Sequence, residues 1–417
     1  YDAVTGKEYL DFFTFFASSA LGYNHPALTS DEFLTRLGRV AVNKVSNSDL
    51  YTTEMAEFVA TFARIAAPRN LQNLFFISGG ALAVENGLKA AFDWKVRKNF
   101  AKGYKEEKGS KVIHFREAFH GRTGYTMSLT NTDPAKINYY PKFDWPRIEN
   151  PKVIFPLEDH LDEVVAAEKR AIAQIEKAIA ADGDDIAAII IEPIQGEGGD
   201  NHFRKEFFME LRRIADENEI ILIFDEVQTG VGITGRMWAH QNFGIEPDII
   251  CFGKKTQVCG IAASDRLNEV DSVFKVSSRI NSTWGGNLAD MFRARKILEV
   301  IEEEKLVENA AKMGKLLQDT LKGFEKKYTG FVGNVRGLGL FCAFDLPDSA
   351  CRDTFITRAM KNGLVVLKCG ARTIRFRPPL NVSGEEIGKA AAILDKALAE
   401  SVKSVCDGDV SGAVHTE

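Results

Sequence analysis

Two strongly apolar runs of the sequence end in residues that can do chemistry together. Asp225 follows the run from Ile220 to Phe224, and Lys254 follows the run from Ile249 to Gly253. Runs this apolar are typical of parallel strands buried on both faces, and such sheets bind ligands beyond the carboxyl ends of their strands. A lysine and an aspartate at that edge suit pyridoxal phosphate. The amine forms a Schiff base, and the acid keeps the pyridine nitrogen protonated as an electron sink.

Lys255 is the neighbour of Lys254, so chemistry alone does not choose between the two amines. We predict Lys254 as the Schiff-base residue because it directly follows Gly253 at the expected strand end. Asp225 is then the predicted partner of the pyridine nitrogen, and Gln228 is expected to reach the ring hydroxyl. The alternatives are a solvated lysine pair and an acid that caps a strand end without a catalytic role.

Other expected strand ends also carry candidate ligand-binding residues. Gly80 and Ala81 begin a predicted helix, where backbone N–H groups and the helix dipole favour a phosphate. Phe119 is expected to stack on a planar ring, and nearby Arg122 to hold a carboxylate. Glu197 lies in a glycine-rich loop and is expected to pair with an arginine when no substrate carboxylate is bound. The alternatives are an ordinary strand-to-helix turn, a packed core phenylalanine and a solvated loop acid.

Arg375 and Arg377 alternate along an extended segment that precedes two prolines, so their side chains share one face. One of them is expected to clamp a substrate carboxylate with two hydrogen bonds. Surface salt bridging explains the pattern almost as well.

The elements that must position these residues follow a β/α alternation. Short apolar runs are separated by segments with apolar residues at helical spacing. The runs are 74–77, 112–115, 187–191, 220–224 and 249–252. This alternation predicts an α/β fold with a mostly parallel sheet in a large domain.

A change of pattern after this alternation indicates a smaller α+β domain. A helical stripe formed by Leu306, Ala310, Met313, Leu317 and Leu321 is followed by strand-like pieces at 338–344 and 363–367. We expect four parts: an N-terminal segment 1–45 that joins the small domain, a large cofactor-binding domain 46–286, a C-terminal small domain 287–405, and a flexible tail 406–417. The sequence begins at Tyr1 without methionine, so we expect a preceding segment.

Composition excludes several classes of function. The formal charge of −5 argues against a nucleic-acid surface, which needs clustered lysine and arginine. No stretch is apolar and long enough to cross a bilayer, and no signal pattern opens the chain, so we expect a cytoplasmic protein. The 6 cysteines lack the close spacing of zinc or redox sites. We therefore expect buried free thiols and no metal.

Together these residues resemble the class III, or ω-, aminotransferases, which are pyridoxal-phosphate enzymes of fold type I. The resemblance runs through nearly the whole chain. It is carried by residues 9–12, 25–26, 119–122, 192–193, 225–230, 247–254 and 336–340. The spacing from Asp225 to Lys254 agrees with the family pattern and supports Lys254 over Lys255.

The resemblance implies roles for individual residues. Gly80 and Ala81 would bind phosphate, Phe119 would stack on the ring, and Gln228 would contact its hydroxyl. Thr283 would reach the phosphate of the partner subunit, which implies a homodimer with the active site at the subunit interface.

For the substrates, the resemblance implies that Arg122 and Arg377 hold carboxylates, that Glu197 pairs with Arg377, and that Asn281 lies at the substrate. The segments 252–260 and 281–287 depart from the commoner family forms. They favour members that transfer the ε-amino group of L-lysine to 2-oxoglutarate. The products would be L-glutamate and 2-aminoadipate 6-semialdehyde, which cyclises to a piperideine carboxylate.

Three other readings stay open. One is a 4-aminobutyrate or ornithine aminotransferase, and another is a pyridoxal-phosphate epimerase or decarboxylase on the same fold. The third is a catalytically silent protein that retains the fold.

Overall fold

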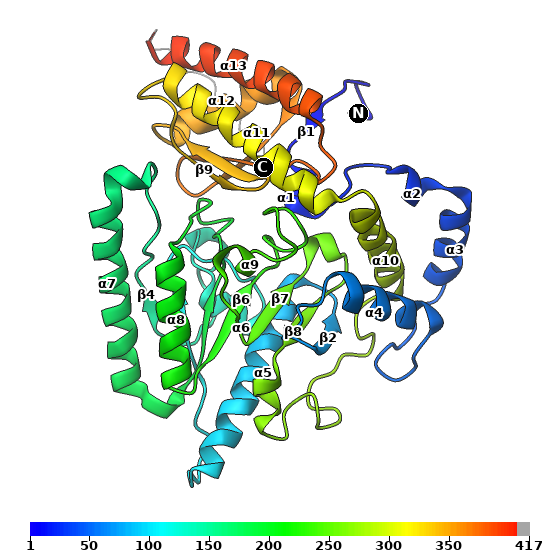
Figure 1. Ribbon diagram of the computed structural model, residues 1–417, viewed down its shortest axis with the longest axis vertical. Coiled ribbons are helices and arrows are strands. Elements are labelled where there is room, and N and C mark those ends of the chain that lie inside the picture. Colours follow the sequence, from blue (N-terminus) through cyan, green and yellow to red (C-terminus); the bar gives the residue numbers. More distant parts are fainter. Residues whose placement is uncertain (407–417) are drawn as a thin grey trace.

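The computed structural model describes residues 1–406, which form two layered parts (Figure 1). The larger part is built on a seven-stranded sheet, and the smaller on a four-stranded sheet. In the smaller part, the long helices α11 (Leu306–Lys327), α12 (Ser349–Lys361) and α13 (Gly384–Cys406) lie above the sheet (Figure 1). The predicted α/β class is confirmed. Apart from Cys406, the predicted flexible tail lies outside the described residues.

The large sheet has the strand order β2-β8-β7-β6-β5-β3-β4. Its strands are β2 (Asn73–Ile77), β3 (Lys111–Phe115), β4 (Arg147–Ile148), β5 (Ile186–Ile191), β6 (Ile221–Asp225), β7 (Ile249–Phe252) and β8 (Cys259–Ala263). All pairings are parallel except those that β8 makes with β2 and β7. The five apolar runs are therefore confirmed as strands, and the sheet is mostly parallel.

Strand β8 is absent from the sequence-based prediction. Its residues, Cys259 to Ala263, include a glycine and two alanines, so the strand lacks the run of branched and aromatic side chains that marks the others. Packing requires a glycine at position 260, because a Cβ on Gly260 would overlap the carbonyl oxygen of Phe75 on the neighbouring strand.

Alternate residues of the central strands enter two separate cores, one on each face of the sheet. In β6, Ile221 and Ile223 face the same core as helix α5 (Gly80–Ala101). Leu222 and Phe224 face the opposite core, with helix α8 (Lys205–Glu217). Because both faces are covered, every residue of β6 is buried, as its apolar sequence indicates.

The register of the central strands determines where Asp225 and Lys254 lie. Strands β6 and β7 are parallel neighbours, and Asp225 lies opposite Cys251. Lys254 follows two residues after β7 ends at Phe252. The acid and the amine therefore emerge at the same edge of the sheet.

The small sheet corrects two sequence-based strand predictions. Residues 338–344 form a hairpin of β9 (Gly333–Leu338) and β10 (Phe341–Asp345), because Gly339 takes a left-handed conformation with φ 56°. Residues 363–367 divide into β11 (Leu364–Val365) and the start of β12 (Leu367–Cys369). Strand β13 (Thr373–Phe376) completes the sheet between β12 and β10. The predicted stripe of α11 is confirmed, since all five of its residues are buried.

The N-terminal residues lie with the C-terminal part of the chain. Strand β1 (Leu10–Asp11) pairs in parallel with β11. Helices α3 (Asp31–Ala41) and α4 (Thr53–Ile65) then pack against α10 (Leu288–Glu303), whose first turn is capped by the side chain of Asn287. The remaining helices are α2 (Pro26–Thr29), α6 (Gly124–Leu129), α7 (Leu157–Asp182) and α9 (His240–Phe243).

Between β1 and α2, the chain makes a left-handed turn, α1 (Thr14–Ala17). Its four residues have φ values of 44°, 51°, 59° and 64°, although none is glycine. Left-handed backbone costs an L-residue about 1–2 kcal/mol, so a run of four needs support from the surrounding structure.

Within residues 1–406, no helix is both long and apolar enough to span a membrane, and no cluster of histidine, cysteine and acidic side chains could hold a metal ion. The five cysteines before Cys406 are free thiols, four of them buried, as predicted.

The contact between α11 and the hairpin turn generates a stability prediction. A Cβ on buried Gly314 would overlap the backbone of Gly339, so we expect Gly314→Ala to lower the free energy of unfolding by about 3 kcal/mol. Gly323, in the same helix, is exposed and has open space at its Cβ position. Gly323→Ala is the matched control and should raise the free energy of unfolding by about 0.5–1 kcal/mol. Equal effects of the two changes in denaturant titrations would contradict the packing described here.

Candidate active site

Asp225 is a buried acid, and within residues 1–406 the one side chain that hydrogen-bonds to it is a histidine. Its Oδ2 lies 2.8 Å from His120 Nδ1, and its Oδ1 accepts a hydrogen bond from the Val227 amide at 3.1 Å. His120 Nε2 is buried without a partner among the described residues. The arrangement leaves the carboxylate available to a protonated ring nitrogen.

The amine of Lys254 is available for covalent chemistry. Its Nζ forms no hydrogen bond or ion pair within residues 1–406, and the residue is partly buried. Burial lowers the pKa of Lys254, Asp225 raises it, and Arg375 lowers it again, with the net result below its ordinary value. A lowered pKa leaves more of the amine unprotonated and nucleophilic.

Lys255, by contrast, is already engaged. Its Nζ donates to the backbone carbonyls of Gln228 at 2.8 Å and Ala17 at 3.3 Å, and the residue is buried. These contacts support Lys254 as the residue that binds the cofactor.

The residues expected to bind phosphate lie beside the loop that follows Asp225. Helix α5 begins at Gly80, and its first backbone bond within the helix runs from the Ala83 amide to the Gly79 carbonyl. The amides before Ala83 are therefore free to bind an anion. A Cβ on Gly80 would lie 3.0 Å from Val227, and one on Gly121 would overlap Ala81. A free amine, a buried acid and a helix N-terminus at one sheet edge fit pyridoxal phosphate.

Phe119 and Glu192 line the same edge. The Phe119 amide donates to Glu192 Oε1 at 2.9 Å, and the Lys136 ammonium lies 5.3 Å from the Phe119 ring. Burial raises the pKa of Glu192 to about 7, with a smaller lowering by His120 and a further rise from Asp225. This carboxyl therefore titrates near neutrality next to the predicted cofactor acid.

Glu197 forms an ion pair with an arginine, as expected, but with a different arginine. It binds Arg375 Nη2, and its second oxygen lies 3.2 Å from Lys136 Nζ. Burial alone would raise the pKa of Glu197, but Arg375 and Lys136 lower it to about 2. The predicted pairing of Glu197 with Arg377 is wrong, and Glu197 is not a solvated loop acid.

Arg377 is bound by a different acid of the same loop. Its Nη2 lies 2.6 Å from Asp200 Oδ1, and its guanidinium lies 3.2 Å from the centre of the Phe341 ring. Gln228 Oε1 accepts two further hydrogen bonds from it. Two acids in one loop face two arginines on one strand face, so the sequence left two pairings open. Asp200 and Lys136 also contact these side chains, but no pattern in the neighbouring sequence indicated either contact.

The two arginines also differ in what covers them. Neither lies at the surface: Arg375 is 1% exposed and Arg377 is 0% exposed, so surface salt bridging is excluded. Arg375 is covered by Glu197 and by Phe16, whose ring lies 5.9 Å from the guanidinium and is itself 47% exposed. The partners of Arg377 are all buried. Rotation of Glu197 would therefore open Arg375 and leave Arg377 covered.

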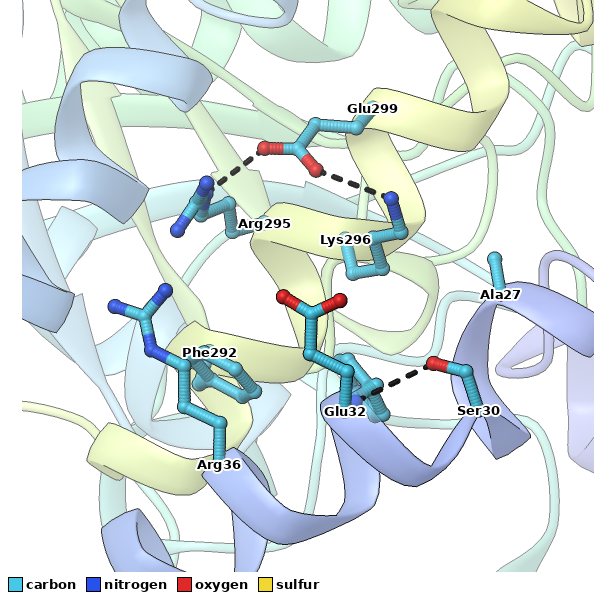
Figure 2. A pocket seen from close by; sticks show the side chains of 9 residues that line it. Ala27, Ser30, Glu32, Arg36, Phe292, Arg295, Lys296 and Glu299 are labelled. Atoms are coloured by element: carbon cyan, nitrogen blue, oxygen red, sulfur yellow. Dashed lines mark hydrogen bonds and ion pairs between the residues drawn. The ribbon is translucent and has the colours of Figure 1, made fainter.

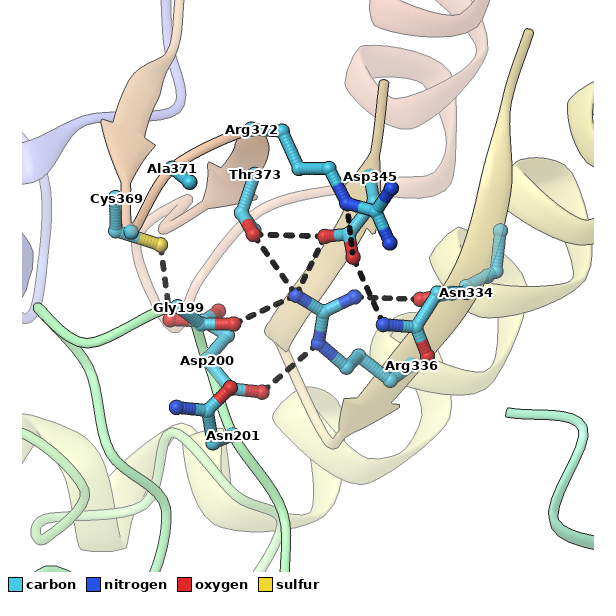
Figure 3. Close-up of polar contacts among 12 residues, drawn as sticks. Gly199, Asp200, Asn201, Asn334, Arg336, Asp345, Cys369, Ala371, Arg372 and Thr373 are labelled. Carbon is cyan, nitrogen blue, oxygen red and sulfur yellow. Dashed lines mark hydrogen bonds and ion pairs between the residues drawn. The ribbon is translucent and has the colours of Figure 1, made fainter. Parts of the chain in front are cut away.

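The loop that carries Glu197 is anchored to the small sheet (Figure 3). Buried Arg336 donates to the carbonyls of Gly199 and Asp200 and to the side chains of Asp345 and Thr373. The Gly370 amide donates to the Glu197 carbonyl at 3.0 Å. Because the backbone is held on both sides, Glu197 can exchange partners by side-chain rotation without movement of its loop.

Gln228 lies between this loop and the arginines. Its Oε1 faces Arg375 and Arg377, and its amide packs where a Cβ of Gly196 would be. Its Nε2 forms no hydrogen bond within the described part of the chain, and this is the donor that a ring hydroxyl oxygen needs.

The other predicted residues lie outside this cluster. Arg122 is exposed and forms no hydrogen bond or ion pair with residues 1–406. Thr283 and Asn281 are also exposed, and the Thr283 carbonyl accepts from Ser46 at 2.6 Å. Neither Thr283 nor Asn281 hydrogen-bonds to the cluster in its own chain.

A separate surface pocket lies between α3 and α10 (Figure 2). Glu299 in its lining binds both Arg295 and Lys296, whereas Arg36 pairs with Glu57 outside the lining. None of the predicted site residues lines it.

The sheet edge and its free lysine define a pyridoxal-phosphate enzyme of fold type I. The model of the family described as Aminotransferase class-III matches residues 1–398, so the chain belongs to this family of transaminases, which depend on pyridoxal phosphate.

Individual relatives agree with this assignment. The chain is 54% identical to an L-lysine-epsilon aminotransferase of Mycobacterium tuberculosis, over 95% of this chain and 88% of that one. It is 32% identical to human mitochondrial 4-aminobutyrate aminotransferase, over 90% and 78%. A solved structure of lysine aminotransferase from M. tuberculosis in the internal aldimine form is similar with a TM-score of 0.94 and 53% identity, covering 96% of this chain and 92% of that chain.

Proposed function

We propose that the protein is an L-lysine 6-aminotransferase of lysine catabolism. It would transfer the ε-amino group of L-lysine to 2-oxoglutarate, giving L-glutamate and 2-aminoadipate 6-semialdehyde, which cyclises to a piperideine carboxylate. The observation that carries this proposal is Arg375, which is covered by a movable acid beside Lys254. The higher identity to the lysine enzyme than to the 4-aminobutyrate enzyme supports the same substrate.

The residues divide the work as follows. When bound, pyridoxal phosphate supplies an aldehyde that condenses with amines and a protonated ring that takes up electrons. Asp225 would hold the proton on the ring nitrogen, and His120, which contacts Asp225, would orient it. Lys254 would hold the cofactor through its Nζ and, when the substrate amine has replaced it there, Nζ would accept the proton from the substrate carbon that bears the reacting amine. Phe119 would stack on the ring, Gln228 would donate to its hydroxyl through Nε2, and the amides of Gly80 and Ala81 would bind phosphate.

The two substrates place different demands on Arg375. Lysine reacts at an amine far from its carboxylate, whereas glutamate and 2-oxoglutarate react beside a carboxylate. Arg375, in place of the predicted Arg377, binds that carboxylate when Glu197 rotates away. With lysine bound, Glu197 returns and pairs with the arginine, since a buried unpaired guanidinium would be costly. Arg122 holds the other carboxylate, and Asn281 contacts the substrate.

We further propose a homodimer with the active site at the subunit interface. Exposed apolar side chains near Thr283 support it: Trp284 is 45% exposed, Leu50 70% and Tyr51 83%. Thr283 would reach the phosphate of the partner subunit. The cytoplasmic location expected from the sequence stays a prediction.

An amino-donor panel tests the substrate. The purified enzyme, loaded with pyridoxal phosphate, is mixed separately with L-lysine, L-ornithine and 4-aminobutyrate, and the loss of the cofactor's absorbance is followed. We expect lysine to react at least about tenfold faster than ornithine, because one methylene changes binding in a fitted site by about 1–3 kcal/mol. It should also react faster than 4-aminobutyrate, which is shorter and has no α-amino group. Mass spectrometry should find two products: glutamate, formed from 2-oxoglutarate, and the cyclised semialdehyde, formed from lysine. Faster reaction of either other donor would overturn the proposal, and product without glutamate would indicate an epimerase or decarboxylase.

The role of Glu197 is tested by comparing half-reactions. We expect Glu197→Ala to slow the lysine half-reaction about 10- to 100-fold, because uncovered Arg375 attracts the lysine carboxylate into the wrong place. The glutamate half-reaction should change less than about threefold. Arg375→Gln is the matched counterpart and should slow mainly the glutamate half-reaction, by about 100-fold. Stopped-flow absorbance measures both rates, and an equal change in the two half-reactions would contradict the masking role.

A further inference from the structure

The left-handed turn at Thr14–Ala17 is held by contacts at both of its ends. At the first, Asp11 Oδ1 accepts from the amides of Phe13 and Thr14, each at 2.8 Å, and Thr14 Oγ1 donates to the Arg377 carbonyl at 2.8 Å. At the second, Lys255 Nζ donates to the Ala17 carbonyl at 3.3 Å. Such unfavourable backbone persists only where surrounding groups fix it, and it is typical of functional sites.

Lys255 is an unusual residue to find in this position. It is buried, and no carboxylate lies within ion-pair distance of its Nζ in residues 1–406. Burial lowers the pKa of Lys255 well below its ordinary value, and the neighbouring Lys254 and Arg377 lower it further. Whether charged or neutral, the amine has at least two N–H donors. An apolar residue of similar size would be buried here at a lower cost in free energy. The hydrogen bonds to the carbonyls of Ala17 and Gln228 therefore explain why the residue is a lysine.

Both acceptors belong to segments that surround Arg375. The turn presents Phe16, whose ring lies 5.9 Å from the Arg375 guanidinium and 4.8 Å from the Phe13 ring. Gln228 Oε1 accepts a hydrogen bond from Arg375 Nη1 at 3.4 Å. Lys255 thus joins two segments that lie 211 residues apart in the chain. Ala17 is 238 positions from Lys255, and Gln228 is 27 positions from it.

We propose that Lys255 is a positioning residue that clamps the left-handed turn, so that Phe16 and Gln228 are both held against Arg375 and the pocket for the substrate carboxylate keeps its shape. The clamp acts on substrate binding, whereas the proton transfer belongs to Lys254. For its substrate this inference rests on the function proposed above.

Replacement of Lys255 by methionine, which keeps the length and removes the donors, tests the clamp in the holoenzyme. We expect the KM for 2-oxoglutarate to rise about tenfold while kcat changes less than about twofold. The pH dependence of the bound cofactor's absorbance should stay unchanged, because Lys254 is untouched. Hydrogen–deuterium exchange of residues 12–19 should become faster, and this readout needs no substrate.

Phe16→Ala and the double variant test whether the effect passes through the turn. Phe16→Ala should raise the same KM, and the double variant should show less than about a twofold further rise, because both changes act on one contact. Thr14→Val, which removes the hydroxyl bond at the other end of the turn, should give the same split between KM and kcat and keeps the test decisive if Lys255→Met does not fold.

Three results would overturn the clamp. They are unchanged exchange of residues 12–19 in Lys255→Met, a fall in kcat with KM constant, and additive effects of Lys255→Met and Phe16→Ala. Failure of the proposed function would look different. The parent enzyme would then fail the amino-donor panel, while the exchange experiment would still report on the turn.

Discussion

The structure depends on a buried carboxylate and a free amine that are held at the ends of two adjacent strands. Asp225 is the last residue of β6 and Lys254 follows β7, and these two strands are parallel neighbours with both faces covered. A carboxylate so enclosed is stable only with partners, and within residues 1–406 Asp225 has one histidine and one amide. In the proposed function, a protonated pyridine nitrogen would complete this set. The sheet therefore provides rigid support for cofactor chemistry, and the loops that follow the strands supply the other contacts.

In the proposed function, substrate selection would depend on a second charged arrangement, the ion pairs of Arg375 and Arg377. Asp200 fixes Arg377 inside the protein, and Glu197 covers Arg375. One arginine is thus structural and the other is available to a carboxylate. Arg336 anchors the loop that holds both acids, so the exchange of partners is confined to one side chain. Two carboxylic substrates of different length can then use one site in turn.

The sequence was sufficient to predict the strands that carry the chemistry, because their apolar runs are buried on both faces. It also predicted that Asp225 and Lys254 lie together where two such runs end, and the structure confirms this placement, whereas their roles toward the cofactor stay predictions. Other features depend on contacts between distant residues. The partner of Glu197 is 178 positions away, and the acceptor of Lys255 in the turn is 238 positions away. Strand β8 was not predicted, because its residues are small to fit their neighbours and so lack the apolar pattern of the other strands. The hairpin at Gly339 was not predicted, because a single left-handed glycine divides an apolar run.

The central claim is that the cofactor is bound by the amine of Lys254 and not by its neighbour. Borohydride reduction of the yellow holoenzyme fixes the cofactor to whichever amine carries it, and peptide mass spectrometry then locates the added mass. The account predicts one pyridoxyl group per chain on Lys254, with Lys255 unlabelled. A label on Lys255, or labelling that persists in Lys254→Ala, would contradict it.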